Sequence, residues 1–234
     1  MARVIPLPGG AEMTQEEGLF PLTQDSVLLA GFVSPKKGER ALDLGCGQGV
    51  LGLILLSRFG DLTVDGIELT PNAAAAARGN YARCGFSSRG EILCGDLRAL
   101  PTALAGKYDF CLSNPPYFDP GRGAVARGEA LACARSAGCT PDELCAAACR
   151  ALRWGGRFFL CYRAERLAGL IAALSRHRLA PKRLRLVHHQ PGRDAVLILL
   201  EARKGGGEGI SIPPPLYMRD EAGEYTAEVL EIYR

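Results

Sequence analysis

Four consecutive residues, Asn114 to Tyr117, combine groups that can act on an amino group attached to an aromatic ring. Such an amine is a poor nucleophile because its lone pair is delocalised into the ring. Two acceptors holding its two protons, the Asn114 side-chain oxygen and the Pro115 carbonyl, would aim that lone pair at an electrophilic methyl carbon. Tyr117 adds an aromatic face on which the ring can stack. We therefore predict Asn114, Pro115 and Tyr117 as catalytic residues.

Two adjacent prolines can also serve only to terminate a strand. The position of this motif favours the catalytic interpretation. It follows the fourth predicted strand, and in a doubly wound sheet that turn faces the ligand crevice. No general base is required, because the methylated nitrogen is acidic and can lose its proton to water.

A second candidate site is the glycine-rich segment D-L-G-C-G-Q-G, from Asp43 to Gly49. Small residues let the backbone approach a ligand closely, and the predicted helix that follows presents free N–H groups. The dinucleotide fingerprint G-x-G-x-x-G does not fit, because the third glycine comes one residue early, at Gly49. This spacing disfavours an NAD-linked oxidoreductase.

Acidic residues end the next two predicted strands. Glu68 stands where a carboxylate can accept hydrogen bonds from both ribose hydroxyls of a nucleoside. Asp96 ends the third strand, in G-D-L. Each acid alone can simply cap the next helix. Together with Asp43 they make three acids after three successive strands, a pattern that indicates a ligand site at one sheet edge.

Apolar runs and helix-like segments alternate along the chain, which is typical of a doubly wound parallel sheet. The run T-P-D-E, beginning at Thr140, predicts a capped helix that extends to about Leu152. Two β-rich runs on either side of Gln190 to Gly192 predict an antiparallel hairpin. We therefore predict an α/β fold: a doubly wound, mostly parallel, seven-stranded, Rossmann-like sheet with a terminal antiparallel hairpin. Its five leading strands are expected over residues 40–45, 62–69, 91–97, 108–114 and 157–163.

With 234 residues, 47% of them hydrophobic, the chain can bury one sizeable core. We expect a single domain with an N-terminal segment and helix (1–38), a catalytic core (39–204) and a linker and tail (205–234). The first residues do not resemble a signal peptide, and no run is long and apolar enough for a membrane span. A cytoplasmic protein without membrane contact is expected.

The nine cysteines are odd in number and include no C-x-x-C pair, which favours reduced thiols. Cys133, Cys139, Cys145 and Cys149 lie close enough in sequence to hold zinc or an iron–sulfur cluster. Packing in a helix is the favoured alternative, so no metal is expected. The net charge of +3 suits a polyanionic partner without requiring one.

The glycine-rich segment resembles the nucleoside loop of class I methyltransferases, and N-P-P-Y resembles the motif of amino-group methyltransferases. This resemblance implies S-adenosyl-L-methionine as cofactor. It places Asp43 near the methionine end and gives Asp96 the amino protons of the cofactor's adenine. The cofactor-binding residues expected on these grounds are Asp43, Gly45, Cys46, Gly47, Gly49, Glu68, Leu69, Asp96, Leu97, Asn114 and Asp25. For Asp25 the alternative is a charge at a helix N-terminus.

Most of residues 15 to 234 resembles the bacterial tRNA adenine-N6 methyltransferase family. The resemblance rests on T-Q-D-S-V-L-L-A-G-F, S-N-P-P-Y-F, W-G-G-R-F and the tail L-Y-M-R-D-x-x-G-E-Y-T. It implies methylation of the N6 amino group of an adenine in tRNA, next to the anticodon of a valine tRNA. Alternatives are the same chemistry on ribosomal RNA or on a release-factor glutamine, or a module that binds cofactor without turnover. The intact motif argues against the last.

An RNA partner, in particular tRNA, calls for residues that hold bases and phosphates. The predicted substrate-binding residues are Tyr117, Phe118, Arg122, Arg127 and Arg135. A second basic cluster, for which solvated surface is the alternative, comprises Arg176, Arg178, Lys182, Arg183 and Arg185. The oligomeric state is not predicted.

Overall fold

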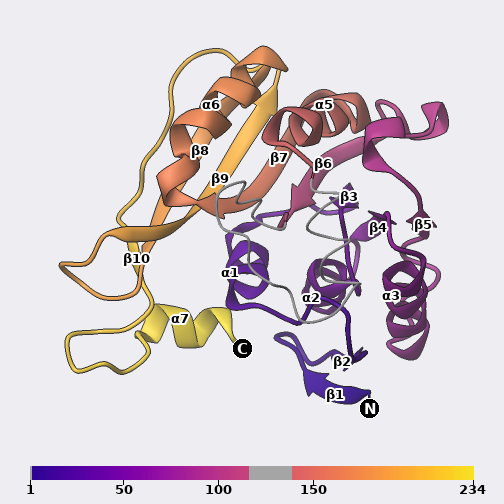
Figure 1. Ribbon diagram of the computed structural model, residues 1–234, viewed down its shortest axis with the longest axis horizontal. Coiled ribbons are helices and arrows are strands. Elements are labelled where there is room, and N and C mark those ends of the chain that lie inside the picture. The colour runs from indigo at the N-terminus through magenta and orange to yellow at the C-terminus, as the bar shows by residue number, and fades with distance from the viewer. Residues whose placement is uncertain (1, 116–138) are drawn as a thin grey trace.

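The computed structural model describes residues 2–115 and 139–234. Its centre is an eight-stranded sheet in the order β10-β8-β9-β7-β6-β3-β4-β5 (Figure 1). Only β9 runs against the other strands, pairing antiparallel with both β7 and β8. The strands are β3 (Arg40–Leu44), β4 (Thr63–Glu68), β5 (Ile92–Cys94), β6 (Tyr108–Ser113), β7 (Leu152–Arg163), β8 (Leu179–His188), β9 (Ala195–Lys204) and β10 (Leu216–Tyr217).

This sheet confirms the predicted α/β fold, and the β8–β9 pair confirms the terminal hairpin. Three details differ. The two-residue strand β10 adds an eighth strand from the tail, and β7 begins at Leu152, before the predicted start at residue 157. A separate hairpin of β1 (Arg3–Pro6) and β2 (Glu12–Gln15) precedes the core. Its strands were missed because each is only four residues long and carries no extended alternating apolar pattern.

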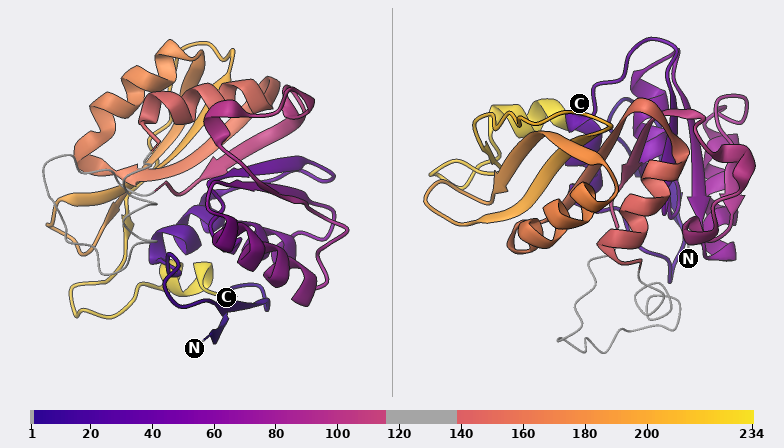
Figure 2. Two further views of the ribbon diagram at one scale, coloured as in Figure 1. Left: turned by 45° about the vertical axis from the view of Figure 1, so that its right-hand side comes forward. Right: turned by 90° about the horizontal axis from the view of Figure 1, so that it is seen from above.

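Helices cover both faces of the sheet (Figures 1 and 2). One face carries α1 (Gln24–Phe32), α2 (Val50–Arg58) and α3 (Pro71–Arg83). The opposite face carries α5 (Pro141–Ala151) and α6 (Leu167–Arg176). Short 3-10 turns occur at η1 (Leu97–Ala99), η2 (Thr102–Leu104) and η3 (Ala164–Arg166). None of the helices in the described ranges has the length and apolar character that a membrane crossing needs.

The C-terminal helix α7 (Ala227–Ile232) packs against α1. It lies beside the N-terminal hairpin (Figure 1), and the Gly9 N–H donates to the Arg234 carbonyl at 2.8 Å. Both ends of the chain are therefore docked on the face that α1 and α2 cover.

Two hydrophobic cores lie between the sheet and its helices, because successive residues of a strand face opposite sides. In β7, Phe159 joins the core under α1 and α2, where its ring meets Phe110 edge to face at 5.7 Å. Its neighbour Phe158 joins the core under α5 and α6. The predicted capping box begins α5: Thr140 Oγ1 accepts from the Glu143 N–H at 3.2 Å, and Glu143 Oε2 accepts from the Thr140 N–H at 2.8 Å.

A buried tyrosine fixes the spacing of α2, α3 and β4. The Tyr81 hydroxyl of α3 donates to the Val64 carbonyl of β4 at 3.2 Å, and the residue is 2% exposed. A Cβ atom at Gly52 of α2 would lie 1.8 Å from that hydroxyl oxygen. Glycine is required at residue 52 because the tyrosine hydroxyl occupies the space of a side chain.

Replacing Gly52 by alanine should lower the free energy of unfolding by about 1–3 kcal/mol, the usual cost of overpacking a core. Tyr81 would have to move and give up its bond to Val64. Urea unfolding followed by circular dichroism measures the change. Tyr81→Phe is the matched background, since it removes the hydroxyl oxygen 1.8 Å from the new methyl group and leaves the ring Cζ atom at 2.9 Å. The alanine should then cost less in the Tyr81→Phe background, and equal costs in both backgrounds would contradict this explanation.

Candidate active site

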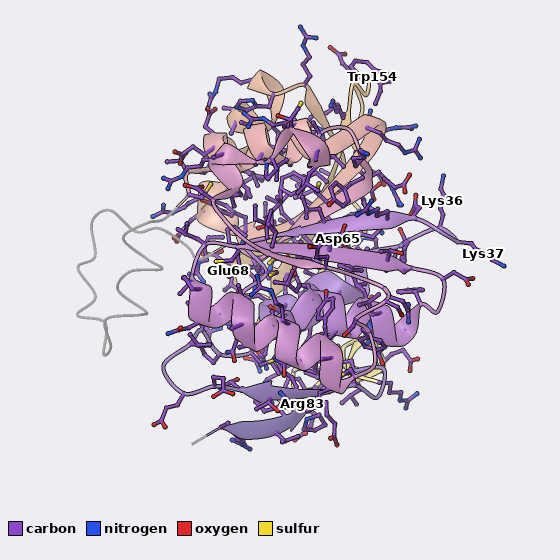
Figure 3. All side chains as sticks on the ribbon, turned by 90° about the vertical axis from the view of Figure 1, so that its right-hand side faces the viewer. Lys36, Lys37, Asp65, Glu68, Arg83 and Trp154 are labelled. Atoms are coloured by element: carbon purple, nitrogen blue, oxygen red, sulfur yellow. The ribbon has the colours of Figure 1, made fainter. Side chains whose placement is uncertain are left out.

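A pocket opens at the carboxyl ends of β3, β4 and β6. Glu68 marks this edge of the sheet in Figure 3, whereas Lys36 and Lys37 project from the opposite edge. The segment Gly18–Pro21, together with Thr23 and Ser26, supplies a further part of the wall. The sequence-predicted residues that line the pocket are Asp43, Gly45, Cys46, Gly47, Glu68, Leu69, Asp96, Leu97 and Asn114.

Other predicted residues do not border the pocket. Asp25 lies in the first turn of α1, as its alternative role of a helix N-terminal charge requires. Gly49 begins α2, and a Cβ there would lie 3.1 Å from the Tyr81 ring, so its small size serves packing against α3. Pro115 is buried directly after Asn114. The remaining predicted substrate and catalytic residues, Tyr117, Phe118, Arg122, Arg127 and Arg135, fall outside the described residues.

The glycine-rich loop turns tightly over the ends of β3 and β4. Gly45 and Gly47 adopt φ values of 76° and 55°, in the left-handed region that favours glycine. The N–H groups of Gly45 and Cys46 both donate to the Ile67 carbonyl, at 2.9 and 3.1 Å. These bonds tie the loop to the last residues of β4 and leave its concave side toward the pocket.

Asp43 is the most unusual group in the pocket wall. It is 1% exposed, and neither carboxyl oxygen has a hydrogen-bond partner among the described residues. Burial, with the nearby charge of Glu68, raises the pKa of Asp43 to about 8. A buried carboxyl without partners is costly, and a ligand that brings a cationic donor would offset that cost. Asp43 therefore indicates a ligand with an ammonium group or a comparable donor.

Glu68 is held ready for a second part of the ligand. Its Oε2 accepts from the Gly47 N–H at 3.0 Å, and its Oε1 accepts from the Thr70 N–H at 2.8 Å. Each carboxylate oxygen can accept more than one hydrogen bond, so hydroxyl donors can still be bound. The carboxylate is thus fixed in the pocket wall with acceptor capacity to spare.

Asp96 is hydrogen-bonded to a neighbouring side chain. Its carboxylate receives the Arg98 side chain at 2.9 Å from Nε and 2.7 Å from Nη2. Its Oδ1 also caps η1 by accepting from the Arg98 N–H at 2.9 Å. These hydrogen bonds to Arg98 lower the pKa of Asp96. The capping role is therefore present, and a ligand amino group would share the carboxylate with Arg98.

The side chain of Asn114 is bound from several sides. Its Nδ2 donates to Ser26 Oγ at 2.9 Å and to Thr23 Oγ1 at 3.3 Å. The Cys161 thiol donates to its Oδ1 at 3.0 Å. Ser113, the last residue of β6, anchors the strand end by donating to the Leu44 carbonyl at 2.7 Å. Sequence reasoning missed Thr23, Ser26 and Cys161 as site residues, although the first two lie in the T-Q-D-S run that carries part of the family resemblance.

Gln48, which sequence reasoning also missed, holds the N-terminal part of the pocket wall. Its Oε1 accepts from the Glu16 N–H at 2.8 Å, and its Nε2 donates to the Phe20 carbonyl at 2.9 Å. The buried Asn80 donates to the Thr14 and Gln48 carbonyls. A side chain of the glycine-rich loop thus fixes the segment that closes one side of the pocket.

The second basic cluster is largely engaged in structural contacts. Arg176 pairs with Asp142 at 2.7 Å, Arg183 with Glu201 at 3.1 Å and Arg185 with Glu228 at 2.5 Å. Lys182 donates to three carbonyls of the glycine-rich linker, Gly207 to Gly209. The hypothesis that this cluster binds RNA phosphates gains no support from these contacts.

The cysteine group spreads over partly and fully buried positions. Cys145 is buried in α5, while Cys139 and Cys149 are half-buried. Burial raises the pKa of the Cys139 and Cys145 thiols to about 12. No set of three metal-ligating side chains occurs within residues 2–115 and 139–234. Cys133 falls outside these ranges.

An acid at the carboxyl end of each of three parallel strands, a glycine-rich loop after the first and Asn114 after the fourth define a methyltransferase of the doubly wound α/β class. The sequence model of the methyltransferase small domain family matches residues 21–167. The chain belongs to this family and, within it, to the group of tRNA1(Val) (adenine(37)-N6)-methyltransferases, as its relatives show.

A tRNA1(Val) (adenine(37)-N6)-methyltransferase of Dickeya chrysanthemi is 30% identical over 215 residues, covering 90% of this chain and 85% of the relative. A Yersinia pestis protein of the same name is 30% identical over 217 residues, covering 89% and 83%. Among solved structures, a predicted O-methyltransferase from Agrobacterium tumefaciens superposes with a TM-score of 0.74 and 26% identity. That alignment covers 89% of this chain and 95% of the other.

The buried carboxyl of Asp43 should make the ligand-free protein less stable as pH rises. The folded state keeps the proton up to about pH 8, whereas an unfolded aspartate loses it near pH 4. The contribution is therefore complete below about pH 4 and lost as pH rises through about 8. Relative to wild type, Asp43→Asn should gain stability between these values by up to about 1.4 kcal/mol per pH unit.

Urea unfolding of both proteins from about pH 5 to about pH 8 measures this difference. Asp61→Asn is the control, because the Asp61 side chain is 64% exposed and should leave the pH dependence unchanged. Parallel stability curves for wild type and Asp43→Asn would contradict the burial of an unpaired carboxyl.

Proposed function

We propose that this protein transfers the methyl group of S-adenosylmethionine to the N6 amino group of an adenine in tRNA. The observation that carries the proposal is one pocket that joins an unpartnered buried carboxyl, Asp43, to an oriented carboxamide, Asn114. The cofactor brings the cationic ammonium that Asp43 lacks among the described residues, and the amide is the group that an exocyclic amine requires. The names of the relatives support adenine in tRNA as the substrate.

The residues of the pocket fit the parts of this cofactor. Asp43 would bind the ammonium of the methionine part, and Glu68 the two ribose hydroxyls. Leu69 and Leu97, which line the pocket, would contact the adenine, and Asp96 would accept from its amino group. When bound, the cofactor supplies an electrophilic methyl group on a sulfonium.

The chain's own residues then prepare the nucleophile. Asn114 Oδ1 and the Pro115 carbonyl accept the two protons of the adenine amino group, which restores the lone pair to nitrogen. Water takes the proton that the methylated nitrogen releases. On the sequence motif alone, we assign Tyr117 to stacking on the base after it leaves its loop. Substrate contacts at Phe118, Arg122, Arg127 and Arg135 are assigned on the same basis.

Asn114→Ala should cut turnover by about a hundredfold or more, the scale of losing a positioned transition-state contact. Cofactor affinity should stay within a few-fold of wild type. The assay uses labelled S-adenosylmethionine and bacterial tRNA that lacks its own adenine-N6 methylation, followed by identification of the product nucleoside. Label in ribosomal RNA or a release factor instead of tRNA would overturn the substrate. Loss of cofactor binding would overturn the role of Asn114.

Cofactor binding should release about one proton near pH 6.5, because Asp43 is protonated in the free protein and must ionise to bind an ammonium. Affinity should therefore rise as pH approaches 8. Calorimetry in two buffers of different ionisation enthalpy measures the proton count. Asp43→Asn should abolish the release and weaken binding about tenfold or more, whereas Asp61→Asn should behave as wild type. Release that persists in Asp43→Asn would place the titrating group elsewhere.

A further inference from the structure

We infer that Thr23, Ser26 and Cys161 are positioning residues that hold the Asn114 carboxamide in the orientation needed for methyl transfer. The inference rests on the proposed function. The two hydroxyls come from the start of α1, and the thiol comes from β7. In the sequence, Thr23 and Ser26 lie 91 and 88 residues before Asn114, and Cys161 lies 47 residues after it. They converge on one amide at the end of β6.

Orientation matters because the two ends of a carboxamide have opposite chemistry. Only the oxygen can accept an amino proton of the substrate, while the NH2 end would oppose it. The terminal torsion of asparagine is broad and does not by itself choose between the two ends. An Asn114 without fixed neighbours would therefore spend part of its time in the unproductive orientation.

The three partners divide this task. Hydroxyls both donate and accept, so Ser26 at 2.9 Å and Thr23 at 3.3 Å fix the plane of the amide. The thiol of Cys161, 3.0 Å from Oδ1, sets which end faces β7 because S–H is a donor and an amide oxygen is the better acceptor. An amide oxygen has two lone pairs, so it can accept from the thiol and from the substrate.

The hydrogen bonding of Thr23 supports a role in orienting Asn114 rather than in stabilising the start of its own helix. Thr23 occupies the N-cap of α1, yet its hydroxyl makes no capping bond and reaches Asn114 instead. Of the three other threonine N-caps in the described helices, Thr140 and Thr226 do cap their own helices. Thr70 makes no capping bond either. An N-cap bond stabilises a helix start, and at Thr23 the oxygen that could accept such a bond accepts from the Asn114 amide instead.

The C-terminal helix in turn holds α1. A Cβ at Gly31 would lie 2.8 Å from the Ile232 side chain, so α1 and α7 approach closely at this glycine. Gln24, next to Thr23, donates to the Tyr225 hydroxyl at 3.1 Å. Figure 1 shows α7 alongside α1. The tail thus stabilises the helix that carries the two hydroxyls.

Ser26→Ala and Cys161→Ala should each lower kcat about tenfold while the cofactor Kd stays within about threefold. Cys161→Ser should recover most of the activity, because a hydroxyl can replace the thiol as donor. In the Asn114→Ala background, neither alanine should lower kcat further, since the amide that they orient is gone. Cys111→Ala is the control: it removes an equally buried thiol from β6, and kcat should not change.

Steady-state methylation at saturating tRNA and cofactor gives kcat, and calorimetric titration gives the cofactor Kd, for every variant. An active wild type whose Ser26→Ala and Cys161→Ala variants keep full kcat would overturn the inference alone. A larger loss in cofactor affinity than in kcat would also overturn it, because the hydroxyls would then serve the cofactor. A wild type that does not methylate tRNA would overturn the proposed function and this inference with it.

Discussion

The parallel pairing of β3 with β4 and β6 is the constraint on which the rest of the site depends. Asp43 stands opposite Gly66 on one neighbour and Leu112 on the other, so all three strands end at one edge. Parallel neighbours require crossovers: α2 connects β3 to β4 and α3 connects β4 to β5, and both helices cover the same face. The register therefore brings the glycine-rich loop, Glu68 and Asn114 together before any of them meets a ligand.

Segments outside this core complete the pocket. At one side, Gln48 fastens the stretch from Glu16 to Phe20 against the glycine-rich loop. At the other, α7 supports α1, whose first residues reach Asn114. Both ends of the chain thus contribute to a site whose chemistry lies in the middle.

The sequence predicted those features that depend on local patterns. Alternating apolar runs revealed the sheet, the glycine spacing located the loop, and a carboxylate after each strand marked Asp43 and Glu68. Contacts between distant segments left no such pattern: Cys161 resembled an ordinary buried thiol, and Gln48 a residue between glycines. The sequence predicted capping as an alternative role for Asp96, but not its pairing with Arg98. Whether a carboxylate after a strand caps the next helix or binds a ligand depends on side-chain geometry, which the sequence pattern does not give.

The unpaired carboxyl of Asp43 also bears on the amount of protein a cell contains. A folded state with this uncompensated group is less stable when empty than when loaded, since any ligand of the native state shifts the unfolding equilibrium. Cells continuously degrade the unfolded fraction of their proteins, so modest changes in stability alter abundance. We expect the steady-state level of this enzyme to follow the supply of its methyl donor. When the donor is scarce, the empty enzyme would be cleared sooner.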